Sequence, residues 1–125
     1  MKIRSLVCIT VILLTASLAQ DAPTITLTGK GLAQRCSRFR YCGESETCTD
    51  KTDILNFGVC TGYIEGVADV NTMEDRACIP SRMTNSQIVR TTLKWMDDNP
   101  KALSADAASV VGRALYASFP CQKHP

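Results

Sequence analysis

The sequence has a single histidine, His124, which is the last residue but one of 125. A catalytic triad or a catalytic cysteine needs a histidine near the nucleophile, and a multi-histidine metal centre needs several. The chain also has no Cys-x-x-Cys pair, the close ligand spacing typical of structural zinc. We therefore expect no hydrolase site of these kinds and no metal site.

The excess of one charge over the other is also small, since the chain has 14 Lys and Arg residues and 12 Asp and Glu residues. A net charge of +2 is too small to predict a nucleic-acid-binding protein. Residues 29–31 (Gly-Lys-Gly) match neither the P-loop nor the dinucleotide-binding pattern. Glu65 and Asp69 lie four apart, but a glycosidase needs a large sugar cleft around its two acids. We interpret them as surface acids and predict a protein that is not an enzyme and uses no cofactor.

The first residues have the pattern of a secretory signal peptide. Lys2 and Arg4 form a basic start, and an apolar run follows over residues 6–14. Small residues before position 20 suit signal peptidase, so we predict that residues 1–19 are removed by cleavage after Ala19. The run is short for a membrane span, and Cys8 lies inside it rather than just after it, which argues against a lipid anchor. A buried N-terminal helix is the alternative interpretation.

Cleavage there would leave six of the seven cysteines. An even number of cysteines in an exported chain predicts a disulfide framework and an oxidising compartment. The sequence by itself does not choose among the possible connectivities. The disulfide candidates are Cys36, Cys42, Cys48, Cys60, Cys78 and Cys121.

The apolar spacing after this point predicts helices and no sheet. Residues 20–27 are expected to form a flexible N-terminal segment. The predicted fold class is all-α, a small four-helix domain stapled by disulfides. The helices are expected at about residues 29–38, at about residues 54–70, between a Thr84–Gln87 capping box and Asn99-Pro100, and between a Ser104 cap and Pro120. The large core candidates are Phe57, Tyr63, Trp95, Leu115 and Phe119.

Gly58, Gly62 and Gly66 lie four apart in the second predicted helix. Each glycine costs a helix interior about 1 kcal/mol relative to alanine, so three on one face need a compensating contact. We expect a neighbouring helix to pack its backbone closely against them. The alternative is that the helix breaks at one of these glycines.

Acidic and basic residues are unevenly spread. Residues 41–75 contain eight acids against Lys51 alone, and the stretches on both sides are basic. Two interpretations remain open: oppositely charged faces that pair within the chain, or an acidic surface that meets a basic partner.

Several short motifs occur together in the order seen in one protein family. They are Cys60-x-Gly-Tyr-x-x-Gly66, Cys78-x-Pro80, Thr84-x-x-Gln87, Trp95 to Pro100, and Phe119-Pro-Cys121. Over residues 28–121 the sequence resembles the Rap/Tai family of periplasmic immunity proteins against type VI secretion effectors. The resemblance implies an exported, non-enzymatic helical domain over residues 28–121. It also implies a toxin–antitoxin-like role, in which the protein, in several members a homodimer, inhibits a peptidoglycan amidase and so prevents lysis.

The resemblance also bears on the cysteines. The loop that holds Cys42 and Cys48 looks longer than the corresponding loop of the family. An additional local bond between these two would leave the other four cysteines as the family-like set. On this basis the implied pairs are 42–48, 36–60 and 78–121.

The mechanism that we infer is steric occlusion of the amidase cleft by a loop. The most loop-like segment is the connection after the second helix, where Met73 would be an apolar anchor beside two acids. An ordinary connecting loop is the alternative. The predicted partner-binding residues are Asn71, Thr72, Met73, Glu74, Asp75 and Arg76.

A function of another class remains an alternative. A periplasmic stress chaperone, or a general envelope protein with the same fold, would also be small, helical and disulfide-bonded. The eight acids of residues 41–75 would lose charge at low pH, and a chaperone should then expose apolar surface and bind clients.

Overall fold

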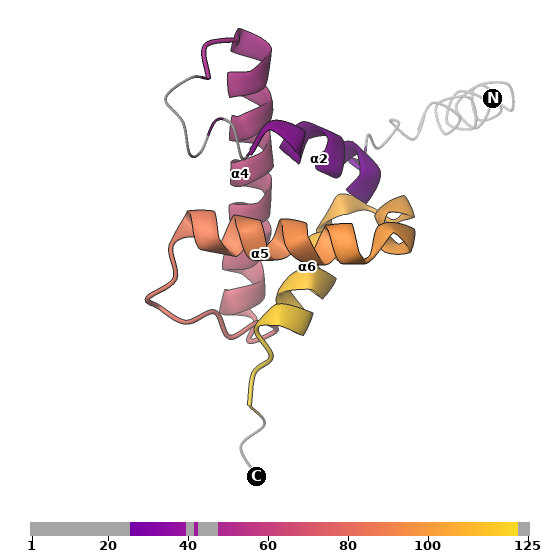
Figure 1. Cartoon of the computed structure of the whole chain (residues 1–125). Helices are drawn as coiled ribbons and strands as arrows, with labels where there is room; N and C mark the ends of the chain where they lie inside the picture. The colour runs from indigo at the N-terminus through magenta and orange to yellow at the C-terminus, as the bar shows by residue number, and fades with distance from the viewer. Residues whose placement is uncertain (1–25, 40–41, 43–47, 123–125) are drawn as a thin grey trace, which may run out of the picture.

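The structure is a computed structural model that describes residues 26–39, 42 and 48–122 (Figure 1). Four α-helices lie in these ranges, and they contain no strand, only a single antiparallel bridge between Thr28 and Asp106. The predicted all-α, four-helix fold is therefore confirmed. The helices are α2 (Gly29–Arg35), α4 (Lys51–Met73), α5 (Asn85–Asp98) and α6 (Ala107–Ser118), with short 3-10 helices η2 (Cys36–Arg38) and η3 (Pro100–Ser104).

Helix α4 is the longest of these elements, and α5 crosses it at a steep angle (Figure 1). The first turn of α4 is capped by Asp50, whose carboxylate accepts hydrogen bonds from the backbone N–H groups of Thr52 and Asp53 at 2.8 and 3.1 Å. The helix extends about one turn beyond the predicted residues 54–70 at each end.

The start of α2 is joined to the start of α6. The backbone N–H of Gly29 donates to the carbonyl of Ala105 at 2.8 Å, and that of Ala107 donates to the carbonyl of Leu27 at 2.7 Å. Thr28 caps α2 by accepting from the N–H of Gly31. A Cβ at Gly29 would lie 2.7 Å from a methyl of Val110, so this close approach requires glycine.

The capping box predicted for α5 is confirmed. The backbone N–H of Gln87 donates to the Thr84 hydroxyl, and the backbone N–H of Thr84 donates to the Gln87 side chain. The prediction that Ser104 caps α6 is wrong. Ser104 ends η3, where its hydroxyl donates to the carbonyl of Lys101, and Asp106 caps α6 instead.

The core lies where α2, α5 and α6 meet the inner face of α4. That face contributes Cys60, Ile64 and Ala68, one residue per turn, all buried. Of the predicted large core residues, Leu115 is fully buried, and the others are partly buried against the core: Phe57, Tyr63, Trp95 and Phe119.

Phe39 is the largest fully buried side chain, and it was not among the predicted core residues. It follows η2, where no helical periodicity marks it as apolar core. Its ring stacks on Phe57 with the centroids 5.6 Å apart. The contact anchors the chain after α2 against the first half of α4.

The expectation of a neighbouring backbone against the glycines of α4 is wrong within the described residues. A Cβ built at Gly58, Gly62 or Gly66 meets no atom within 4 Å, beyond those of the helix itself. The reason is the orientation of the helix: the residues that pack on α2, α5 and α6 lie on the opposite side. The helix does not break at any of the three glycines.

Three disulfides join the described cysteines. Cys36 bonds to Cys60, Cys42 to Cys48, and Cys78 to Cys121, with Cα–Cα distances of 5.0, 4.8 and 4.9 Å. These are the pairs that the family resemblance implied. The first links η2 to the middle of α4, and the last links the segment after α4 to the segment after α6.

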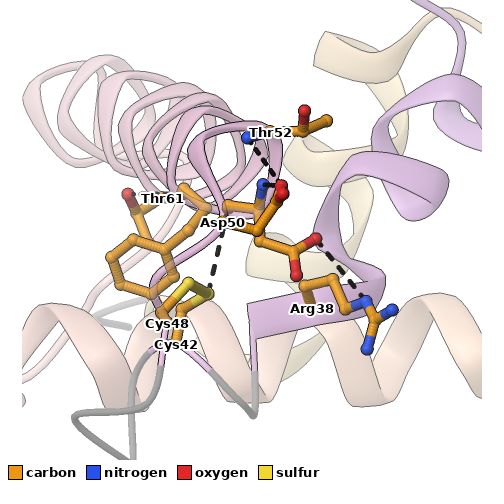
Figure 2. Close-up of a disulfide and its surroundings, with 8 residues drawn as sticks. Arg38, Cys42, Cys48, Asp50, Thr52 and Thr61 are labelled. Carbon is orange, nitrogen blue, oxygen red and sulfur yellow. Dashed lines mark hydrogen bonds and ion pairs between the residues drawn. A yellow bond between two sulfur atoms is a disulfide. The ribbon is translucent and has the colours of Figure 1, made fainter.

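Figure 2 shows the Cys42–Cys48 disulfide beside the first turns of α4. The Cys42 sulfur lies 3.8 Å from the backbone carbonyl oxygen of Asp53, and the carboxylate of Asp53 lies 3.6 Å from the guanidinium of Arg38. This local bond therefore lies at the start of α4, at the opposite end from the residues predicted to bind a partner.

Candidate partner-binding site

The predicted binding segment lies where α4 ends, and it is less loop-like than expected. Asn71, Thr72 and Met73 form the last helical turn, and only Glu74 to Arg76 lie beyond the helix. The prediction that this whole segment is a connecting loop is therefore wrong in its first half. The pattern of glycines and acids contains no clear stop signal at residue 70.

The turn after α4 is a closed Schellman motif. The backbone N–H of Arg76 donates to the carbonyl of Asn71 at 2.8 Å, and that of Asp75 donates to the carbonyl of Thr72 at 3.2 Å. Asp75 has a φ of 53°, the one positive value among the described non-glycine residues. Aspartate adopts this left-handed conformation more readily than bulkier residues do. The motif gives the turn a defined backbone shape.

Two side chains of this turn are tied to their own chain. The Asn71 amide donates to the carbonyl of Val67 at 2.8 Å and is partly buried. The Arg76 guanidinium lies 2.9 Å from the Glu74 carboxylate, an exposed ion pair. The side chain of Asn71 is therefore bound to its own helix and partly buried, whereas the other five predicted residues are exposed.

Met73 is the most exposed of the large apolar side chains, at 84%. It lies at the end of a rigid helix and directly before the closed turn. We name residues 72–76 the α4 tip. A solvent-exposed methionine on a fixed backbone costs little to desolvate and adapts its shape to a partner's pocket. This geometry suits an apolar anchor.

A disulfide and a backbone hydrogen bond link the segment after the α4 tip to the chain's C-terminal segment. Cys78 bonds to Cys121, and the backbone N–H of Cys78 donates to the carbonyl of Phe119 at 2.8 Å. The sulfur of Cys121 lies 3.4 Å from the carbonyl oxygen of Asp75. Ala77, between the tip and the disulfide, is buried. The disulfide and these contacts therefore hold the backbone next to the α4 tip in place.

An open groove of about 1290 Å³ runs beside the tip between α4 and α6. Its lining includes glycine, alanine and valine positions of the two helices. Tyr116 of α6, 64% exposed, and Val70 of α4, 51% exposed, also line it, together with Arg76 and Arg113. The sequence did not predict that α6 lines this groove, because no sequence pattern indicates that α6 lies next to this face of α4.

One titratable group of the groove has a shifted pKa. Hydrogen bonds from Ser109, first from its hydroxyl and then from its backbone N–H, lower the pKa of Asp106. The backbone bond measures 2.8 Å and caps α6. The carboxylate therefore stays ionised at the groove's edge at neutral pH.

The described acids of residues 50–75 are spread along α4 and the turn after it. Asp50 caps α4, Asp53 lies beside Arg38, and Glu74 lies beside Arg76. These contacts favour the interpretation in which charges are satisfied within the chain. Glu65 is partly buried and Asp69 exposed, both on α4.

A comparison with known protein families matches residues 28–121 to the Rap1a immunity proteins. The chain belongs to this family. The match spans all four described helices and the Cys78–Cys121 disulfide. A search of curated proteins gave no significant match. The relationship to the Rap/Tai immunity proteins, which the ordered motifs indicated, is therefore confirmed.

Family membership indicates an immunity protein that binds a secreted effector protein. Immunity proteins are generally not enzymes, and those of this kind are typically exported. No helix in the described ranges is both long and apolar enough to cross a membrane.

Proposed function

We propose that the chain is a periplasmic immunity protein that binds a peptidoglycan amidase delivered by type VI secretion and covers its active site. The match of residues 28–121 to the Rap1a immunity proteins carries this proposal. The amidase as target, the periplasm as location and a homodimer as the acting form come from the resemblance to the Rap/Tai proteins.

Three disulfides in so small a chain support export. Disulfides persist in the bacterial periplasm and are rare in the cytosol, where thiols are kept reduced. The predicted signal peptide, residues 1–19, lies outside the described residues and would provide the export route. Cleavage after Ala19 is part of the proposal, and the mass of the secreted protein tests it.

The α4 tip is the part of the molecule that we assign to the amidase. Its exposed Met73 would enter the apolar part of the amidase cleft, and Glu74 and Asp75 would meet basic groups at the cleft's rim. The bracing by Cys78–Cys121 keeps the tip's shape fixed before binding, so little conformational entropy is lost when the complex forms. The inhibitor would act by excluding the peptidoglycan stem peptide from the catalytic groups.

The experiment is an inhibition assay with the purified chain and each peptidoglycan amidase that the producing bacterium encodes next to its type VI effectors. We expect one amidase to lose its activity at a 1:1 ratio of chains. In the same assay, Met73→Ala with Glu74→Gln and Asp75→Asn should weaken inhibition. A set of amidases that all keep full activity would refute the proposal.

The matched control for the tip is Asp50→Asn with Asp53→Asn, at the far end of α4. These variants also remove negative charge from an α4 terminus. Inhibition should survive them. If both sets of variants inhibit like the unchanged chain, the tip is not the contact, although the immunity function would still hold.

A further inference from the structure

Met73 is both the apolar side chain of the α4 tip and a chemically reactive one. Its side chain is 84% exposed, and it carries a thioether, which takes up an oxygen atom from peroxides and becomes a sulfoxide. The sulfoxide is polar and chiral, whereas the original side chain is apolar and flexible. Oxidation at this position would therefore change what the tip can bind.

The other described methionines are covered by the fold. Met96 is 1% exposed in the core, and Met83 packs against the core with only part of its surface exposed. Since an oxidant must reach the sulfur atom, exposure decides which methionine reacts first. Met73 should react well before Met83 and Met96.

The described cysteines do not compete with Met73 for the oxidant. A free thiolate is the usual first target of a peroxide. Each cysteine in the described ranges is already bonded to another one in a disulfide and has no thiol to offer. Mild oxidation of this part of the chain should therefore begin at the Met73 sulfur.

The reaction is a two-electron oxidation of the Met73 thioether. A lone pair of the sulfur attacks one oxygen of hydrogen peroxide, the O–O bond breaks, an S–O bond forms, and water leaves after proton transfer. In the reverse step a dithiol supplies two electrons and two protons, the oxygen leaves as water, and the dithiol becomes a disulfide. Methionine sulfoxide reductases, one for each epimer of the sulfoxide, catalyse this reduction.

The sulfoxide should leave the fold of the tip unchanged. The turn after α4 is closed by hydrogen bonds between backbone atoms, such as the bond of 2.8 Å from the N–H of Arg76 to the carbonyl of Asn71. In the free protein the sulfoxide oxygen at this exposed position stays in water. Inside an apolar pocket of a partner it would lose that water, which costs binding free energy.

We propose that Met73 is a site of reversible oxidation and that its sulfoxide prevents the α4 tip from holding the effector. The oxidant is a peroxide, and the reductant is a dithiol acting through a sulfoxide reductase. The effect on binding rests on the proposed function, whereas the site of oxidation does not. The chain would then protect against its effector only while Met73 is reduced.

The first test is treatment of the purified protein with dilute hydrogen peroxide, followed over time by peptide mass spectrometry. The peptide that contains Met73 should gain one oxygen first, while those of Met83 and Met96 stay unmodified. The Tm of the oxidised protein should equal that of the untreated protein, because the side chain makes no buried contact. Oxidation of Met83 or Met96 at the same rate as Met73 would overturn the assignment.

The second test measures amidase inhibition after the peroxide has been removed, so that the amidase itself is never oxidised. Each variant is compared with its own untreated sample. Peroxide should raise the inhibition constant of the unchanged chain and of the control Met83→Leu about tenfold or more. The constant of Met73→Leu, whatever its starting value, should not respond to peroxide.

The third test is recovery. Sulfoxide reductases with a dithiol should remove the added oxygen and restore inhibition, and an unoxidised sample treated in the same way controls for reduction of the disulfides. A sulfoxide at Met73 without loss of inhibition, or an equal loss in Met73→Leu, would overturn the proposal. An untreated chain that inhibits no amidase would instead refute the proposed function, and the peptide masses would still decide the oxidation site.

Discussion

Cys78 and Cys121 form a disulfide directly behind the tip of α4, and the sulfur of Cys121 lies 3.4 Å from the carbonyl oxygen of Asp75 in that tip. The bond joins two segments that are 43 residues apart in sequence. It therefore constrains the unfolded chain strongly and supports the candidate binding surface in the folded one.

Replacing both cysteines of this bond by serine should lower the free energy of unfolding by about 4 kcal/mol in the chain-entropy account of disulfides. The same replacement at Cys42 and Cys48, only six residues apart, should cost about 2 kcal/mol. Urea unfolding of the two double variants checks the difference. Equal losses would contradict an account in which the closed loop's length decides.

The pKa of Asp106 gives a pH dependence. Hydrogen bonds from Ser109 lower this pKa in the folded protein relative to the unfolded chain. The ionised cap therefore stabilises the fold above the unfolded pKa, and the stabilisation is lost as the pH falls through the lower, folded value. Asp106→Ala should lower Tm at neutral pH, and the difference from the unchanged protein should shrink on acidification. A difference that is the same at all pH values would show that the charge does not matter.

Gly29 and Gly31 provide a matched pair in α2. Alanine at Gly29 would press its Cβ against the Val110 side chain and the Leu103 backbone, so we expect a loss of about 1–3 kcal/mol despite the better helix propensity. At Gly31 the nearest atom, at 3.1 Å, belongs to the flexible end of Leu27. Alanine there should be close to neutral. Thermal unfolding of the two variants decides, and equal effects would contradict the packing described at Gly29.

Phe39→Ala should cost about 3–5 kcal/mol, because Phe39 is fully buried and stacks on Phe57. The loss should appear in equilibrium unfolding as a lower midpoint in urea. Tyr116→Ala, at an exposed aromatic side chain on α6, is the control and should change stability little. A small effect of Phe39→Ala would mean that the segment after α2 is not part of the cooperative core.

The features that could be predicted from the sequence are local. The Thr84–Gln87 box depends on residues three apart, and the stop before Pro100 depends on the residue beside it. The cap of the last helix could not be predicted in the same way, because Ser104 and Asp106 are both good capping residues. Only the short η3 helix, which uses the Ser104 hydroxyl, decides between them.

The candidate site was harder to predict because it depends on how helices lie against one another. The exposure of Met73 follows from its place on the outer side of α4, and the groove requires α6 to be placed next to Gly62. The spacing of Gly58, Gly62 and Gly66 marks one line of the helix. Spacing does not say whether a contact there comes from the same chain or from another, and the described part of this chain leaves that line uncovered.

The most direct test of the immunity account is a lysis assay in a susceptible bacterium. The amidase effector encoded beside this protein would be directed to the periplasm, alone or together with this chain, and the turbidity of the culture followed. The account predicts rapid lysis with the effector alone, and survival when the exported chain is present. Lysis at the same rate with and without the chain, although both proteins are present in the periplasm, would contradict it.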